Sequence, residues 1–138
     1  MPPSPYVLDS CSLIHCERSS DLRKLPPPDA RLFVPDRVAR EVNKPGQALE
    51  RWLKRYPGVV TRMLPEEGTL YLQFRVQLET RLDDGEAAAL AIAVHRNATL
   101  VTDDAAAQRK AAAHGVRCLS TQDFLQQVLP RQMRLDEA

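Results

Sequence analysis

Residues 98–104 read Ala98-Thr99-Leu100-Val101-Thr102-Asp103-Asp104, a short apolar run that ends at two adjacent acids. The alanine-rich segment Glu86 to His95, which has a helical composition, precedes this run. Asp104 to His114 follows it as a second helical segment, with Gly115 as its stop, and Val116 to Leu119 is another short apolar run. This order of helix, strand, helix and strand is typical of a parallel sheet with helical crossovers.

The same alternation extends towards the N-terminus. The apolar patterns predict further strands at Tyr6–Leu8, Arg31–Val34 and Val59–Leu64, and further helices at Leu13–Leu25, Pro35–Asn43, Gln47–Tyr56 and Thr121–Leu129. Thr69 to Leu82 fits the period of a strand and that of a helix, and its length and charged residues favour the helix. We therefore predict a single three-layer α/β/α domain with a central, mainly parallel sheet. Its core spans about residues 6–129, and a polar tail occupies 130–138.

Composition excludes several classes of protein. With 138 residues, of which 43% are hydrophobic, the chain can bury a core without disulfides or a structural metal. The net charge of +1 argues against a histone-like polycation, and no apolar run approaches the length of a membrane span. The first residues have no basic stretch followed by an apolar one, and the three cysteines are an odd number. We expect reduced thiols and a cytoplasmic protein.

Acidic residues follow two of the predicted strands. Asp9 comes after Tyr6–Leu8, and Asp103 comes after Thr102, so both lie at carboxyl ends of strands, where open α/β sheets bind ligands. Glu41, on a predicted helix, and Glu86, at the start of another, can point to the same place. Four carboxylates in one cleft require a cation between them, and oxygen ligands of this kind select Mg²⁺ or Mn²⁺.

Each of these acids also has a structural interpretation. Asp9 and Asp104 precede helices and can cap them, as can Asp84, and Glu86 in a first turn interacts favourably with the helix dipole. Glu41 is the exception, because it lies past the first turn, at the border of the predicted core face of its helix. For the pair Asp103 and Asp104, we expect the first to be functional and the second to be the cap.

Four motifs in order carry a resemblance to a known family. They are Tyr6-Val7-Leu8-Asp9-Ser10, Val34-Pro35-Asp36-Arg37-Val38-Ala39-Arg40-Glu41-Val42, Gly85-Glu86-Ala87-Ala88-Ala89-Leu90-Ala91 and Leu100-Val101-Thr102-Asp103-Asp104. Over nearly the whole chain, this order resembles the PIN domain, a family of metal-dependent ribonucleases that includes toxins of bacterial toxin–antitoxin pairs. Two positions differ from the commoner family pattern: Glu86 stands where Asp is more frequent, and Cys11 where Asn or Ser is.

The resemblance implies a site and a reaction. Asp9, Glu41, Glu86 and Asp103 match the acidic residues that bind Mg²⁺ or Mn²⁺ and hydrolyse RNA phosphodiester bonds. Asp9 and Asp103 would be direct ligands of the metal, and Glu41 and Glu86 would bind it directly or through water. Ser10 would orient a ligand or a phosphate.

The resemblance also implies partners, namely a small antitoxin protein and a second copy of the chain. Four aromatic residues offer apolar surface for such a homodimer: Trp52, Tyr56, Tyr71 and Phe74. Basic residues recur beside Glu41, and we expect three of them to contact RNA phosphates: Arg37, Arg40 and Lys44. Further basic residues follow at Arg51, Lys54, Arg55, Arg109 and Lys110.

Other readings compete with a nuclease. A catalytically degenerate PIN-like domain that binds RNA or protein stays open, because the acids can persist for structural reasons. A haloacid-type phosphatase needs a second Asp at the position of Cys11, and a receiver domain needs a Lys that Val116–Leu119 lacks. Cys11, His15 and Cys16 have residue types that zinc uses, although a fourth ligand is not evident and buried thiols are the simpler interpretation.

Overall fold

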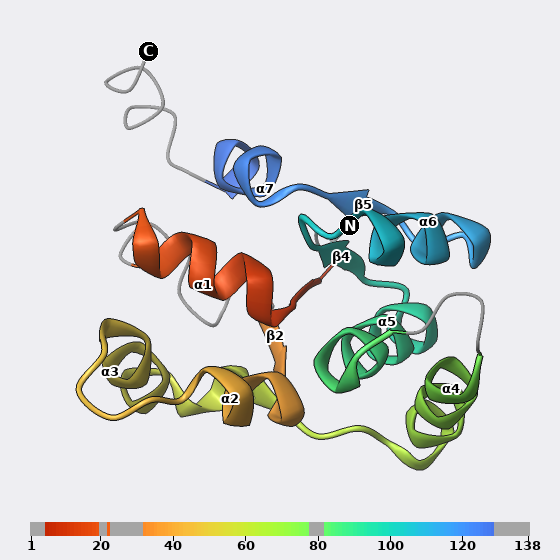
Figure 1. The fold of residues 1–138 in the computed structure, drawn as a ribbon, viewed down its shortest axis with the longest axis horizontal. Coiled ribbons are helices and arrows are strands. Elements are labelled where there is room, and N and C mark those ends of the chain that lie inside the picture. The colour runs from red at the N-terminus through yellow and green to blue at the C-terminus, as the bar shows by residue number, and fades with distance from the viewer. Residues whose placement is uncertain (1–4, 20–21, 23–31, 78–81, 129–138) are drawn as a thin grey trace.

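The computed structural model describes residues 5–19, 22, 32–77 and 82–128 (Figure 1). The predicted C-terminal tail, and the parts of the helix predictions that reach beyond residue 19 or into 78–81, lie outside these residues. Helices and strands alternate along the chain as predicted. In chain order the elements are β1 (Tyr6–Leu8), α1 (Ser10–Arg18), β2 (Leu32–Pro35), α2 (Asp36–Val42), α3 (Ala48–Arg55), η3 (Pro57–Val59), β3 (Val60–Thr61), α4 (Pro65–Val76), α5 (Asp84–Arg96), β4 (Thr99–Val101), α6 (Ala105–Ala113), β5 (Cys118–Leu119) and α7 (Thr121–Val128).

The five strands form one parallel sheet in the order β3-β2-β1-β4-β5. The chain builds β1, β2 and β3 outwards in one direction and then returns to place β4 on the other side of β1. Leu8 of β1 is paired with Val101 of β4, so these two strands end side by side. The strand order reverses between β1 and β4, and this is the place where open α/β sheets bind their ligands.

Successive side chains along the strands point alternately into two separate cores, one on each face of the sheet. Leu8 of β1 belongs to the core under α1, α2, α3 and α7, whereas Val7 belongs to the core under α4, α5 and α6. Figure 1 shows α1 and α3 on one side of the sheet and α4 and α5 on the other. The predicted three-layer α/β/α architecture is therefore confirmed.

Helix α5 is buried on most sides, as its alanines predict. The residues from Ala87 to Ala93 are at most 1% exposed, because the small side chains let α4, α2 and the sheet approach the helix closely. The helix ends at Asn97 in the left-handed conformation, a regular way to terminate a helix. No helix in the described part of the chain is long and apolar enough to cross a membrane.

Two helices begin three or four residues before their predicted starts, because side chains cap them earlier. Helix α1 begins at Ser10 rather than Leu13, since the Asp9 carboxylate accepts a hydrogen bond from the Ser12 N–H at 3.1 Å. Helix α4 begins at Pro65 rather than Thr69, and its Glu67 side chain accepts from the Leu64 N–H at 2.7 Å.

The aromatic residues expected at a dimer surface are used within the fold, so that part of the prediction is wrong. Trp52 and Phe74 are buried in the two cores, and the Tyr71 hydroxyl donates a hydrogen bond to Asp84. Tyr56 is partly buried against Trp52. The large apolar side chains that the described residues leave exposed are instead aliphatic, and three of them belong to α4 or precede it directly: Leu64, Leu72 and Val76.

Candidate functional site

The candidate site lies at the carboxyl ends of β1 and β4. Asp9 directly follows β1, and Asp103 and Asp104 follow one residue after β4. Because Leu8 and Val101 are register partners, these acids emerge from neighbouring strands at the same edge of the sheet. Helix α5 begins beside this edge and adds Glu86, while α2 contacts α5 and adds Glu41.

Asp9 is almost completely buried, with 1% of its surface exposed. Its Oδ1 accepts hydrogen bonds from the Ser12 N–H at 3.1 Å and from the Cys11 thiol at 3.0 Å. Burial raises the pKa of the Asp9 carboxyl, and hydrogen bonds from Cys11, Thr102 and Ser12 only partly oppose this effect. Asp9 therefore caps α1, as its structural interpretation predicts. Its negative charge is also costly to bury.

Glu86 is a second acid of the site with a raised pKa. It lies in the first turn of α5, and its backbone N–H donates to the Asp83 cap at 2.8 Å. Burial, followed by the hydrogen bond and charge of Asp83 and the charges of Asp104 and Asp9, raises the pKa of Glu86 to about 8. The negative charges around Glu86 thus outweigh the favourable dipole of its own helix.

Glu41 faces the start of α5 rather than the basic side chains on its own helix. Val38 and Val42 are buried as predicted, and a Cβ added to Gly85 would lie 2.7 Å from Glu41 Oε1. Burial and the charges of Asp83 and Asp84 raise the pKa of Glu41, while hydrogen bonds from the Ser10 side chain and the Gly85 backbone lower it. Ser10, predicted to orient a ligand or a phosphate, thus holds a predicted metal ligand.

Asp103 uses both carboxylate oxygens in contacts with α7 and α1. Oδ1 accepts from the Thr121 N–H at 2.8 Å, and Oδ2 lies 2.8 Å from the Thr121 hydroxyl and 3.1 Å from His15 Nδ1. Although burial opposes the effect, hydrogen bonds from Thr121 and His15 keep the pKa of Asp103 below its usual value. None of these partners belongs to α2 or α5. The role of Asp103 as a metal ligand stays a prediction.

The charge of Asp104 acts on Glu86. Asp104 also caps α6, because its Oδ1 accepts from the Ala107 N–H at 2.8 Å, which confirms the predicted cap. Capping the helix does not prevent Asp104 from acting in the cleft, because a carboxylate has two oxygens and the cap uses one of them. The signal that points to a second role is the tandem Asp103-Asp104, which contains one acid more than a cap needs.

The donor set of the cleft suits a hard divalent cation. Asp9, Glu41 and Glu86 all have raised pKa values, and none of them forms an ion pair with a cationic side chain of the described residues. In the described part of the chain, no three Asp, Glu, His or Cys side chains are close enough as placed to share one ion. The chemistry of the oxygen donors fits Mg²⁺ or Mn²⁺, and side-chain movements would have to complete the coordination.

The predicted zinc alternative is not supported by this arrangement. Cys11 contacts Asp9 and the Thr102 hydroxyl, whereas His15 contacts Asp103. Burial and the nearby charge of Asp9 raise the pKa of the Cys11 thiol to about 11, which disfavours the thiolate that zinc binds. None of the three cysteines forms a disulfide, as predicted.

The predicted phosphate-binding residues fall into two groups. Arg37 is engaged within the fold, since its guanidinium lies 2.9 Å from Asp84 Oδ1 and 4.5 Å from the centre of the Tyr71 ring. Arg40 is 70% exposed and lies 3.8 Å from Asp36, a weak surface pair, and Lys44 is exposed beyond the end of α2. Arg40 and Lys44 can therefore reach a ligand without a rearrangement, whereas Arg37 would have to leave Asp84.

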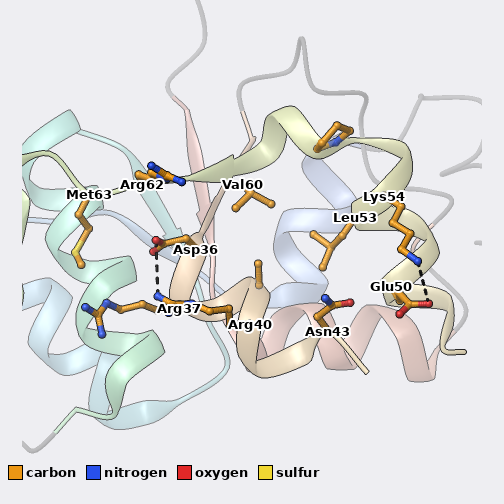
Figure 2. Close-up of a pocket in the computed structure, with 12 residues that line it drawn as sticks. Asp36, Arg37, Arg40, Asn43, Glu50, Leu53, Lys54, Val60, Arg62 and Met63 are labelled. Atoms are coloured by element: carbon orange, nitrogen blue, oxygen red, sulfur yellow. Dashed lines mark ion pairs between the residues drawn. The ribbon is translucent and has the colours of Figure 1, made fainter. Parts of the chain in front are cut away.

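A groove of about 850 Å³ runs along this basic side of α2 (Figure 2). It lies between α2, α3 and the edge strand β3, and both signs of charge line it. Its basic side chains are Arg37, Arg40, Lys54 and Arg62, and its acidic ones are Asp36 and Glu50. Both acids balance part of the basic charge directly, because Lys54 lies 3.7 Å from Glu50 and Arg40 lies 3.8 Å from Asp36.

Comparison with known proteins shows which family the chain resembles. A family model described as PIN domain matches residues 5–133. No curated protein matches the sequence.

Solved structures share the fold at low sequence identity. PAE2754 from Pyrobaculum aerophilum matches with a TM-score of 0.60 and 17% identity, over 91% of this chain and 96% of that one. FitAcB from Neisseria gonorrhoeae matches with a TM-score of 0.58 and 15% identity, over 85% and 98%. VapBC2 from Rickettsia felis, bound to a DNA fragment from their promoter, matches with a TM-score of 0.53 and 14% identity, over 83% and 97%.

Proposed function

This chain belongs to the PIN domain family, and from this premise we propose that it is a ribonuclease that hydrolyses RNA phosphodiester bonds with Mg²⁺ or Mn²⁺. One observation carries the proposal. Asp9, Glu41 and Glu86 come from different elements, border the edge of the sheet where the strand order reverses, and all have raised pKa values. Such a group of acids is poorly suited to stabilising a fold and well suited to binding a cation.

The acids have distinct places in this proposal. Asp9 is held by hydrogen bonds from Ser12 and Cys11, which orient its carboxylate as an oxygen donor of the site. Glu86 on α5 lies near enough to be affected by the charge of Asp9, and Glu41 on α2 is hydrogen-bonded by the neighbouring Ser10. Asp103 is the fourth acid that the sequence predicts, with Asp104 as the alternative because its charge also acts on Glu86. When bound, the divalent ion would lower the pKa of a water ligand and balance the charge that develops on the phosphate.

The basic side chains beside the cleft support an RNA substrate. Arg40 and Lys44 lie on α2 or just beyond it, on the same segment that supplies Glu41, and both are exposed. Contacts from these side chains to phosphates would hold the strand without reading its sequence. Arg37 instead keeps Asp84 in place, and it is a supporting residue rather than a substrate contact.

The biological setting belongs to the same proposal. We assign the chain to the toxin side of a toxin–antitoxin pair in the cytoplasm, with a small antitoxin as its partner. The resemblance to PIN-domain toxins supports this assignment, as does the solved relative VapBC2, which is bound to a DNA fragment from their promoter. A homodimer would use the exposed aliphatic residues of α4 rather than the buried aromatic ones. A gene for a small DNA-binding protein directly upstream would strengthen the assignment.

A cleavage assay on labelled single-stranded and stem-loop RNA tests the activity. We expect cleavage with Mg²⁺ or Mn²⁺, none with EDTA, and at least a hundredfold loss in Asp9→Asn. Asparagine is as good a helix cap as aspartate, so this variant should keep its fold. Glu66→Gln, on the exposed surface of α4, is the matched control and should cleave like the parent. RNA binding without any cleavage would instead favour the alternative of a degenerate binding module.

A further inference from the structure

A second cavity opens beside Asp103, along α1. It has a volume of about 570 Å³, and its lining consists of Cys11, Ile14, His15, Arg18, Ser19 and Asp103. Positions 11, 14, 15 and 18 share one face of a helix, so they form a stripe about 10 Å long. The stripe starts at the cleft, because the Cys11 thiol donates to Asp9 at 3.0 Å.

His15 is held in a defined position within this cavity. Its Nδ1 lies 3.1 Å from Asp103 Oδ2, and Asp103 is itself fixed by the Thr121 N–H and hydroxyl at 2.8 Å each. The imidazole is 47% exposed, and the contact with Asp103 leaves its Nε2 available to a ligand. Asp103 thereby acquires a role that does not depend on a metal, namely to orient His15.

Arg18 supplies the positive charge of the cavity. It is the last residue of α1 and is exposed. No carboxylate of the described residues lies within ion-pair distance of its guanidinium, in contrast to Arg37 and Arg96, which pair with Asp84 and Glu67. A guanidinium in this situation is a ready partner for a phosphate, because its planar N–H groups match two phosphate oxygens.

We propose that this cavity is a subsite for the nucleotide that flanks the scissile phosphate in an RNA strand, with Arg18 on its phosphate and His15 Nε2 as a second polar contact. The proposal rests on the proposed nuclease function for the position of the scissile phosphate. A strand that reaches the cleft must pass a group of acids that repels its other phosphates. The stripe on α1 leads away from Asp9 and ends in a positive charge.

The salt dependence of RNA binding tests the subsite independently of cleavage. A labelled mixed-sequence RNA of about 12 nucleotides is titrated in EDTA at several salt concentrations. For Arg18→Ala we expect weaker binding and a log–log slope that is smaller by about 0.7, the value for one contact to a single strand. Arg18→Lys should restore the slope, because the charge returns. His15→Ala removes a hydrogen bond and should weaken binding about fivefold.

Arg117→Ala is the matched control, since it removes one exposed arginine directly before β5, at the end of the sheet opposite the acids. Its affinity and slope should equal those of the parent. Equal slopes for Arg18→Ala and Arg117→Ala would overturn the subsite, because Arg18 would then contribute only to the general charge of the surface.

Cleavage kinetics separate this inference from the function on which it rests. With Mg²⁺ or Mn²⁺, Arg18→Ala should raise the KM for RNA several-fold and leave kcat unchanged, because the contact is the same in the ground state and the transition state. A parent that shows the expected slopes and cleaves nothing would overturn the nuclease and support the subsite as an RNA contact. A parent that cleaves RNA with a KM insensitive to Arg18→Ala would overturn the subsite alone.

Discussion

Two glutamates near opposite ends of α5 show how differently one protein can treat a carboxylate. Glu67, on α4, is fully buried against the C-terminal end of α5. Its oxygens lie 2.6 and 2.9 Å from the Arg96 guanidinium and 2.9 Å from His95 Nδ1, and one of them accepts from the Leu64 N–H. Glu86, at the N-terminal end of α5, faces other acids instead.

The pKa values of these two groups move in opposite directions. Hydrogen bonds and charge from Arg96, with Leu64 and His95, overcome the burial of Glu67 and lower its pKa. Burial and the acids around Glu86 raise its pKa to about 8. The Glu67 carboxylate joins α4 to α5, whereas the negative charge of Glu86 has no cationic partner among the described residues and would have to be balanced by a ligand. The first group serves stability, and the second is expected to serve function at a cost in stability.

The same substitution at both positions should have the largest effect at Glu67. Glu67→Gln leaves the Arg96 charge without its partner in a buried site, so we expect unfolding to become easier by about 3 kcal/mol. This loss corresponds to a fall in Tm of roughly 10 °C for a domain of this size. Glu86→Gln removes repulsion and should be as stable as the parent without metal. Urea and thermal unfolding in EDTA measure both, and a larger loss at Glu86 would contradict the comparison.

A divalent metal should stabilise the acidic N-terminal end of α5 and not the end that Glu67 contacts. A cation that binds the folded protein at a hundred times its Kd adds about 2.7 kcal/mol by mass action. We expect Mg²⁺ or Mn²⁺ to raise the Tm of the parent by several degrees, and that of Glu41→Gln by less. Without metal, Glu41→Gln should be as stable as the parent or more so, because Ser10 and Gly85 can still donate to the amide oxygen. Equal metal shifts in both proteins would remove Glu41 from the site.

The pH dependence of stability should carry opposite signs for the two glutamates. The folded protein holds a proton on Glu86 up to pH about 8, whereas the unfolded chain releases it near pH 4.3. The metal-free parent should therefore lose stability as the pH rises between these values, and Glu86→Gln should lose less. Glu67 has a lowered pKa, so its contribution is present above about pH 4.3 and is lost as the pH falls through its folded pKa. Unfolding of both proteins at several pH values in EDTA checks these signs.

The smallest expected difference in stability lies between the two adjacent aspartates. Asp103→Asn weakens contacts to Thr121 and His15, for which we expect a cost of about 1 kcal/mol, whereas Asp104→Asn keeps a competent cap. For catalysis we expect the reverse order. Asp104→Asn should lose more activity and more metal-induced stabilisation, since the charge of Asp104 acts on Glu86 and Asp103 is engaged by Thr121 and His15. A metal shift lost in Asp103→Asn and kept in Asp104→Asn would restore the assignment made from the sequence.

Much of the fold follows from local patterns. The short apolar runs predicted all five strands, and the alanine-rich segments predicted α5 and α6, because burial on one or two faces leaves a direct mark on the sequence. Element ends were less accurate where a side chain acts on the backbone. Asp9 extends α1 to Ser10, and Glu67 helps to start α4 at Pro65, and neither effect is visible in the period of the apolar residues.

Local patterns are enough to predict that acids follow β1 and β4 and that Glu41 lies at the edge of a core face, because strand ends and helix faces are local properties. Which acids face one another depends on tertiary contacts. In the folded protein, Asp103 contacts Thr121 and His15, and Arg37 forms an ion pair with Asp84. Trp52 and Phe74, which the sequence predicts at a dimer surface, are buried in the cores. The physical reason is that the pairing of a charge and the burial of a ring depend on neighbours from distant segments, and neither is encoded at the residue itself.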